Sequence, residues 1–144
     1  MQPRNPHYVR AVEELFSKAA FIQEVGYVLV GVEPGRVETR LEVQPRHLQQ
    51  DGVVHMGVQA TMADHTAGSA AGTLIAEDQW VLTTGFTMNL LQTALGEQLR
   101  CRSTVLRAGR TISVAESEVY AVARGEEKLV SKATVTLAVL ARKR

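Results

Sequence analysis

The sequence has little cysteine, few aromatic residues and no excess of charge of either sign. A single cysteine, Cys101, excludes an internal disulfide framework. The 16 Lys and Arg residues are balanced by 15 Asp and Glu residues, so the chain lacks the clustered positive charge that nucleic-acid binding requires. A chain of 144 residues can bury a core without disulfides or a metal ion, and we expect one domain over residues 1–144.

Long apolar runs are also missing. The first ten residues contain two prolines and two arginines, and they lack the continuous apolar segment of a signal peptide. No apolar stretch approaches the roughly 20 residues that span a bilayer. These absences predict a cytoplasmic protein with neither a membrane nor a nucleic acid as partner.

The remaining pattern predicts two helices and about six strands. The helices are expected over residues 6–20 and 56–75, the strands over 27–32, 37–43, 80–91, 97–106, 111–123 and 128–140, and a loop over 45–54. Between the first two strands, Pro34 and Gly35 suit a type II turn. This order predicts an α+β fold in which an antiparallel sheet packs on the long helix. Because such a sheet leaves strand edges exposed, we expect a second subunit to pair with one of them.

The long helix is rich in small residues. Gly57, Thr61, Asp64, Gly68 and Ala71 follow at three- and four-residue steps, and they form a narrow face around one carboxylate. Such a face permits close approach of another backbone. A tightly packed core helix with Asp64 at its rim explains the same composition equally well.

The start of this helix carries the groups that acyl transfer needs. Free backbone N–H groups near Met56 and Gly57 can bind a developing oxyanion, and Asp64 can act as general base or nucleophile. At about 1.5 Å rise per residue, however, Asp64 lies roughly 10–12 Å from the helix start. We therefore expect composite sites in a dimer, where antiparallel helices bring Asp64 of one subunit to the amides of the other.

A metal site is not expected. His55, Asp64 and His65 are candidate ligands, but adjacent helical residues point about 100° apart and no fourth ligand is evident. The sequence predicts no metal and no cofactor.

Three segments together resemble the PaaI-type acyl-CoA thioesterases of the hotdog fold. The first runs from Gly52 through His55-Met56-Gly57 to Asp64, and it is similar to that family's His-Gly-Gly motif followed by a helical Asp. The second covers residues 85–96, where the family has a strand that ends before a turn, and the third is the Arg-x-Gly-Arg hairpin of residues 107–110. The resemblance implies a long central helix wrapped by an antiparallel sheet of about six strands. It also implies a homodimer or homotetramer that hydrolyses acyl-CoA or aryl-acyl-CoA to the free acid and coenzyme A.

The resemblance also implies roles for the catalytic candidates. Asp64 would activate or become the attacking group, and the N–H of Met56, beside Gly57, would polarise the thioester carbonyl. Gln49 stands where the family has an Asn that holds the thioester or the water. Thr83, with Thr84 as substitute, would position the nucleophile.

The same resemblance implies that the remaining candidates bind substrate. His55 would shape the loop before the helix, while Arg107, Gly109 and Arg110 would lie near the phosphates of coenzyme A. The bland alternatives are a packed loop histidine for His55 and solvated hairpin charges for the two arginines.

Two departures from the family motif leave other functions open. Met56 replaces the middle Gly of His-Gly-Gly, so its side chain should reshape the acyl pocket, and Gln49 replaces the Asn. These changes keep open a non-catalytic acyl-CoA binding module. A hotdog enoyl-CoA hydratase is a further alternative, because Asp51 and His55 resemble the acidic residue and histidine that such hydratases pair.

Overall fold

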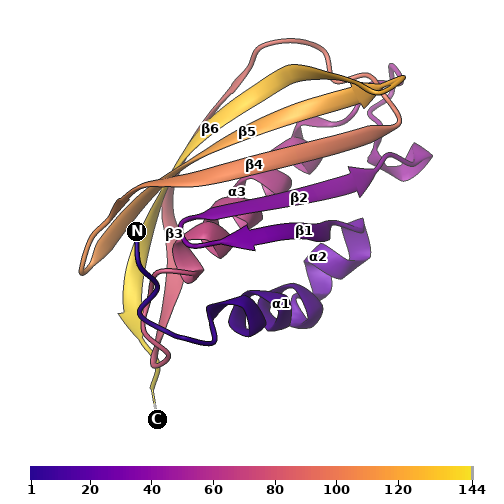
Figure 1. The fold of residues 1–144 in the computed structure, drawn as a ribbon. Coiled ribbons are helices and arrows are strands. Elements are labelled where there is room, and N and C mark those ends of the chain that lie inside the picture. Colours follow the sequence, from indigo (N-terminus) through magenta and orange to yellow (C-terminus); the bar gives the residue numbers. More distant parts are fainter. Residues whose placement is uncertain (144) are drawn as a thin grey trace.

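The computed structural model describes residues 1–143 and shows one curved sheet wrapped around one long helix (Figure 1). The helices are α1 (Tyr8–Lys18), α2 (Ala20–Val25) and α3 (Met56–Gly72), with a single 3-10 turn, η1, over Pro45–His47. The strands are β1 (Val28–Glu33), β2 (Arg36–Glu42), β3 (Gln79–Leu90), β4 (Gln98–Ala108), β5 (Ile112–Ala123) and β6 (Glu126–Ala141). The expected α+β hotdog arrangement is confirmed.

All neighbouring strands are antiparallel, in the order β1-β2-β4-β5-β6-β3. β3 therefore lies at one edge, and among residues 1–143 it pairs with no strand but β6, although it precedes β4 in the chain. Residues 91–97 carry the chain from this edge back to the middle of the sheet. β1 forms the other edge, and α1 runs beside it (Figure 1).

Small side chains let α3 lie close against the sheet. Ala63, Ala67, Ala70 and Ala71 of α3 are at most 1% exposed, and the Ser117 hydroxyl on β5 donates to the Ala63 carbonyl at 2.7 Å. Much of the small-residue composition thus serves the helix–sheet contact. On the predicted small-residue face, Gly57, Thr61, Asp64 and Gly68 are half-buried and Ala71 is buried.

The N-terminal part departs from the expected single helix. The chain leaves helical geometry at Ala19 (φ −80°, ψ 94°), and the short helix α2, which the sequence did not predict, ends at Gly26 in the left-handed region (φ +104°). The expected turn at Pro34-Gly35 is present, and Gly35 has the positive φ of +77° that a type II turn requires.

One predicted boundary was wrong, and one predicted loop has more internal structure than the sequence indicates. The long helix ends at Gly72 instead of residue 75, and the expected loop over 45–54 contains η1 and a bridge between Leu48 and Val54. His47 explains η1, because its Nδ1 accepts the Gln44 N–H at 3.0 Å and its Nε2 lies 2.7 Å from the Val25 carbonyl oxygen. No helix within residues 1–143 is long and apolar enough to cross a membrane.

Candidate active site

Asp64 is held by a threonine from the edge strand. The Thr83 hydroxyl donates to Asp64 Oδ1 at 2.7 Å, and both residues are half-buried between α3 and β3. Thr84, the substitute considered from sequence, is exposed and its hydroxyl donates to the Thr136 carbonyl at 3.4 Å. The strand register shifts between Thr83 and Gly85, so Thr83 is the threonine that reaches the carboxylate. Within residues 1–143 the second Asp64 oxygen accepts no hydrogen bond, which leaves it available to water or to an electrophile.

The start of α3 presents one free amide. His55 is the N-cap residue, and its Nδ1 accepts the Gly57 N–H at 2.8 Å. The Gly57 N–H is therefore engaged, whereas the Met56 N–H has no partner in the described part of the chain. Since a helix N-terminus carries partial positive charge, this amide can stabilise an oxyanion. The His55 side chain shapes this turn, as expected for a capping residue.

Gln49, His55 and Met56 line one hollow beside the end of β3, where Leu90 lies. The Gln49 N–H donates to the Val53 carbonyl at 2.8 Å, and its side-chain oxygen accepts the Asp51 N–H. The loop thus folds on itself and holds Gln49 beside the start of α3.

Gln59 is a residue that the sequence analysis missed. It is 3% exposed and lines the same hollow, and its Oε1 accepts a 2.8 Å hydrogen bond from the Ser131 hydroxyl of β6. Its amide nitrogen donates to the Val54 carbonyl at 3.4 Å, and the Val54 N–H donates to the Ala94 carbonyl at 3.0 Å. Gln59 therefore ties the segment before α3 to the sheet. A long amide among small helical residues, one turn after the cap, was the available signal.

The structure does not bring the two halves of the expected site together within one chain. Met56 and Asp64 are eight residues apart on α3, which is about 12 Å along the helix axis. A carbonyl bound at the Met56 N–H therefore lies beyond reach of Asp64 in the same chain.

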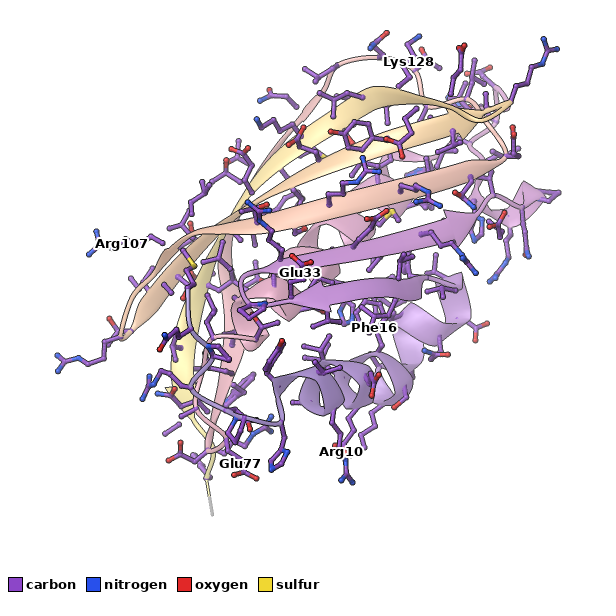
Figure 2. All side chains as sticks on the ribbon, in the orientation of Figure 1. Arg10, Phe16, Glu33, Glu77, Arg107 and Lys128 are labelled. Atoms are coloured by element: carbon purple, nitrogen blue, oxygen red, sulfur yellow. The ribbon has the colours of Figure 1, made fainter. Side chains whose placement is uncertain are left out.

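The arginine hairpin lies at the other end of the sheet from the loop before α3 (Figure 1). Arg107 projects away from the body of the molecule (Figure 2), and Arg110 is also exposed. Neither guanidinium makes an ion pair with a described residue. At Gly109 an added Cβ would lie 2.2 Å from the Ile112 carbonyl oxygen, so only glycine fits this turn.

His65 is adjacent to Asp64 but serves packing. Burial lowers the pKa of His65 to about 4, against the opposing effect of the Asp64 charge. Its ring meets the Phe16 ring edge-on at 4.5 Å between centroids, and its Nε2 has no hydrogen-bond partner among residues 1–143. Phe16 lies on the side of α1 that faces the sheet, whereas Arg10 projects from the opposite side (Figure 2). His65 is therefore a neutral contact between α1 and α3.

The Cys101 thiol is unreactive, and Asp51 and His55 are not hydrogen-bonded to each other. Burial raises the pKa of the Cys101 thiol to about 11, so this cysteine is no nucleophile at neutral pH. Asp51 and His55 share no hydrogen bond, because the Asp51 carboxylate accepts from Gln50 and His55 Nδ1 from Gly57. Of the residues described, no three or more His, Cys, Asp or Glu gather where they could hold a metal ion.

The sequence and the fold of this chain are similar to those of known proteins. Residues 51–128 match the family model of the thioesterase superfamily. The structure of a thioesterase family protein from Silicibacter pomeroyi superposes with a TM-score of 0.91 and 34% identity, covering 93% of this chain and 98% of that one. A protein of Saccharolobus solfataricus, provisionally named an esterase, is 31% identical over 112 residues, which cover 76% of this chain and 79% of that protein. The 1,4-dihydroxy-2-naphthoyl-CoA hydrolase of Listeria monocytogenes is 26% identical over 117 residues, 81% of this chain and 93% of that enzyme.

Proposed function

This chain belongs to the thioesterase superfamily, and we propose that it hydrolyses an acyl-CoA or aryl-acyl-CoA to the free acid and coenzyme A. The observation that supports this most strongly is the 2.7 Å hydrogen bond by which Thr83 orients the Asp64 carboxylate. A carboxylate held by one oxygen keeps the other for the reaction. The name of the Listeria relative supports an aromatic acyl group.

The active site is shared between two subunits. Antiparallel packing of two α3 helices on Gly57, Thr61 and Gly68 would bring Asp64 of one subunit near the free Met56 N–H of the partner subunit. The edge strand β3 supports such an assembly, because Leu82 is 48% and Phe86 38% exposed there. A dimer, and a tetramer built from two dimers, is the proposed form.

In this site the partner's Met56 N–H would donate to the thioester carbonyl oxygen and stabilise the negative charge that develops on it. Asp64 would either take a proton from the attacking water or attack the carbonyl carbon itself, followed by hydrolysis of the acyl-enzyme. In either route the carbon–sulfur bond breaks when the tetrahedral intermediate collapses, which precedes hydrolysis of any acyl-enzyme, and coenzyme A leaves as a thiolate that takes up a proton from solvent. Gln49 would hold the substrate or the water, and Thr83 would keep Asp64 aligned.

The hairpin arginines would bind the phosphates of coenzyme A. Arg107 and Arg110 are exposed and unpaired within residues 1–143, so their donors are available to an anion. Gly109 maintains the turn that carries them.

The test is thiol release from a panel of short, branched and aromatic acyl-CoAs. Asp64→Asn should reduce turnover by at least about 100-fold because it removes the base or nucleophile. Asp78→Asn is the matched control, since Asp78 is exposed in the turn between α3 and β3. Turnover in Asp64→Asn equal to that of wild type would refute the assignment.

The same panel separates the alternative functions. Addition of water to crotonyl-CoA without thiol release would indicate a hydratase, for which Asp51 and His55 offer no hydrogen-bonded pair. Tight binding of CoA esters without turnover, unaffected by Asp64→Asn, would indicate a binding module, consistent with the departures at Met56 and Gln49.

A further inference from the structure

A cavity of about 200 Å³ lies between α1, the end of α3 and the start of β3. Its apolar side includes Ala11 and Leu15 of α1, Gly72 and Ile75 at the end of α3, and Trp80 and Val81 of β3, and its polar side is formed by Asn5, Glu77, Gln79 and Arg142. An apolar cavity of about 150 Å³ is enough to bind benzene. This cavity therefore has room for one aromatic ring or a branched chain of similar size.

The cavity begins two residues from Thr83 along β3, and along α3 it lies about two helical turns from Asp64. Val81 is two residues before Thr83 on β3, so the two side chains point to the same face about 7 Å apart. On α3, Gly68 and Gly72 follow Asp64 at four-residue steps along one face. No side chain from these two positions separates the Asp64 carboxylate from the cavity.

Gly72 is not required by the backbone or by packing. It has no positive φ, and a Cβ built there would meet no atom within 4 Å. Alanine would favour the helix more, and any side chain at this position would enter the cavity. The absence of a side chain keeps this space open.

We propose that this cavity binds the acyl group of the substrate and that Gly72 limits the size of that group. The proposal rests on the proposed thioesterase activity. With the thioester carbonyl at Asp64, Gly72 lies about 12 Å farther along the helix axis, so an acyl group that carries a ring would extend toward the cavity, whereas an acetyl group would not. The α1 wall lies outside residues 51–128, the part that matches the family model.

The experiment compares kcat/KM for phenylacetyl-CoA and acetyl-CoA in three variants. Gly72→Leu should lower the ratio of the two values by about tenfold to 100-fold, because hydrophobic pockets discriminate by about that factor for each filled or missing group. Leu15→Ala should shift preference toward acyl groups larger than phenylacetyl. Gly31→Leu is the matched control, because Gly31 also has open space around it but lies on β1, the far edge strand.

The outcomes separate this proposal from the activity on which it rests. If wild type releases thiol from no acyl-CoA, both fail. If wild type is active but Gly72→Leu lowers both substrates equally, or matches Gly31→Leu, only the acyl cavity is refuted. A Gly72→Leu variant that changes the oligomeric state, measured by light scattering, would instead assign the cavity to a side chain of the partner subunit.

Discussion

Replacing His65 should change how the stability of the protein depends on pH. Burial lowers the pKa of His65 from 6.5 to about 4 in the folded chain. As pH falls below 6.5, His65 is protonated in the unfolded state but stays neutral in the folded state, so the free energy of unfolding decreases. A difference of about 2.5 pKa units corresponds to about 3 kcal/mol, lost between pH 6.5 and 4 and constant below that range.

The assay is urea unfolding at several pH values between 7 and 4, for wild type and His65→Leu. The variant cannot take up this proton, so the gap between the two stability curves should change by about 3 kcal/mol across the range. Other titrating groups are common to both proteins and cancel in the difference. His7→Leu is the control, because His7 is exposed before α1. Parallel curves for wild type and His65→Leu would refute the argument that burial keeps His65 neutral.

Three other changes test the site. Thr83→Val should lower kcat about tenfold or more through loss of a hydrogen bond to a charged group, while Thr84→Val should stay near wild type in the same thiol-release assay. His55→Ala should destabilise α3 by about 1 kcal/mol through loss of its cap, and His55→Asn should recover most of this in urea unfolding. Arg107→Ala and Arg110→Ala should raise KM for CoA esters and leave kcat unchanged, and the KM of these variants should depend less on salt concentration than the KM of wild type. A wild-type KM that does not change with salt would contradict phosphate binding.

The elements with strong local patterns were predictable from the sequence. Alternating strands from residue 80 onward and the small-residue helix from Met56 emerge from periodicity alone, since each pattern is repeated over many residues. The break at Ala19 and the turn at His47 were not predictable, because they depend on contacts such as His47 with Val25, 22 residues away.

The site divides in the same way. Asp64 stood out because a lone carboxylate among Ala and Gly is a local feature, and Thr83 came from the family resemblance. That the Thr83 hydroxyl meets this carboxylate depends on a register shift in β3, which no local pattern shows. Gln59 was missed because its partner Ser131 is 72 residues away.

The position of β3 also bears on how the protein is made. During vectorial synthesis β3 leaves the ribosome before β4 and β5. Its neighbour in the sheet, however, is β6, the last of the described strands. β3 can therefore join the sheet only after residues 126–141 have emerged. Until then an apolar strand that carries Trp80, Leu82 and Phe86 lacks a pairing partner and is open to misassembly. The edge at β3 is thus the last part of the sheet to form, and chaperone engagement should concentrate in the interval between the synthesis of β3 and that of β6.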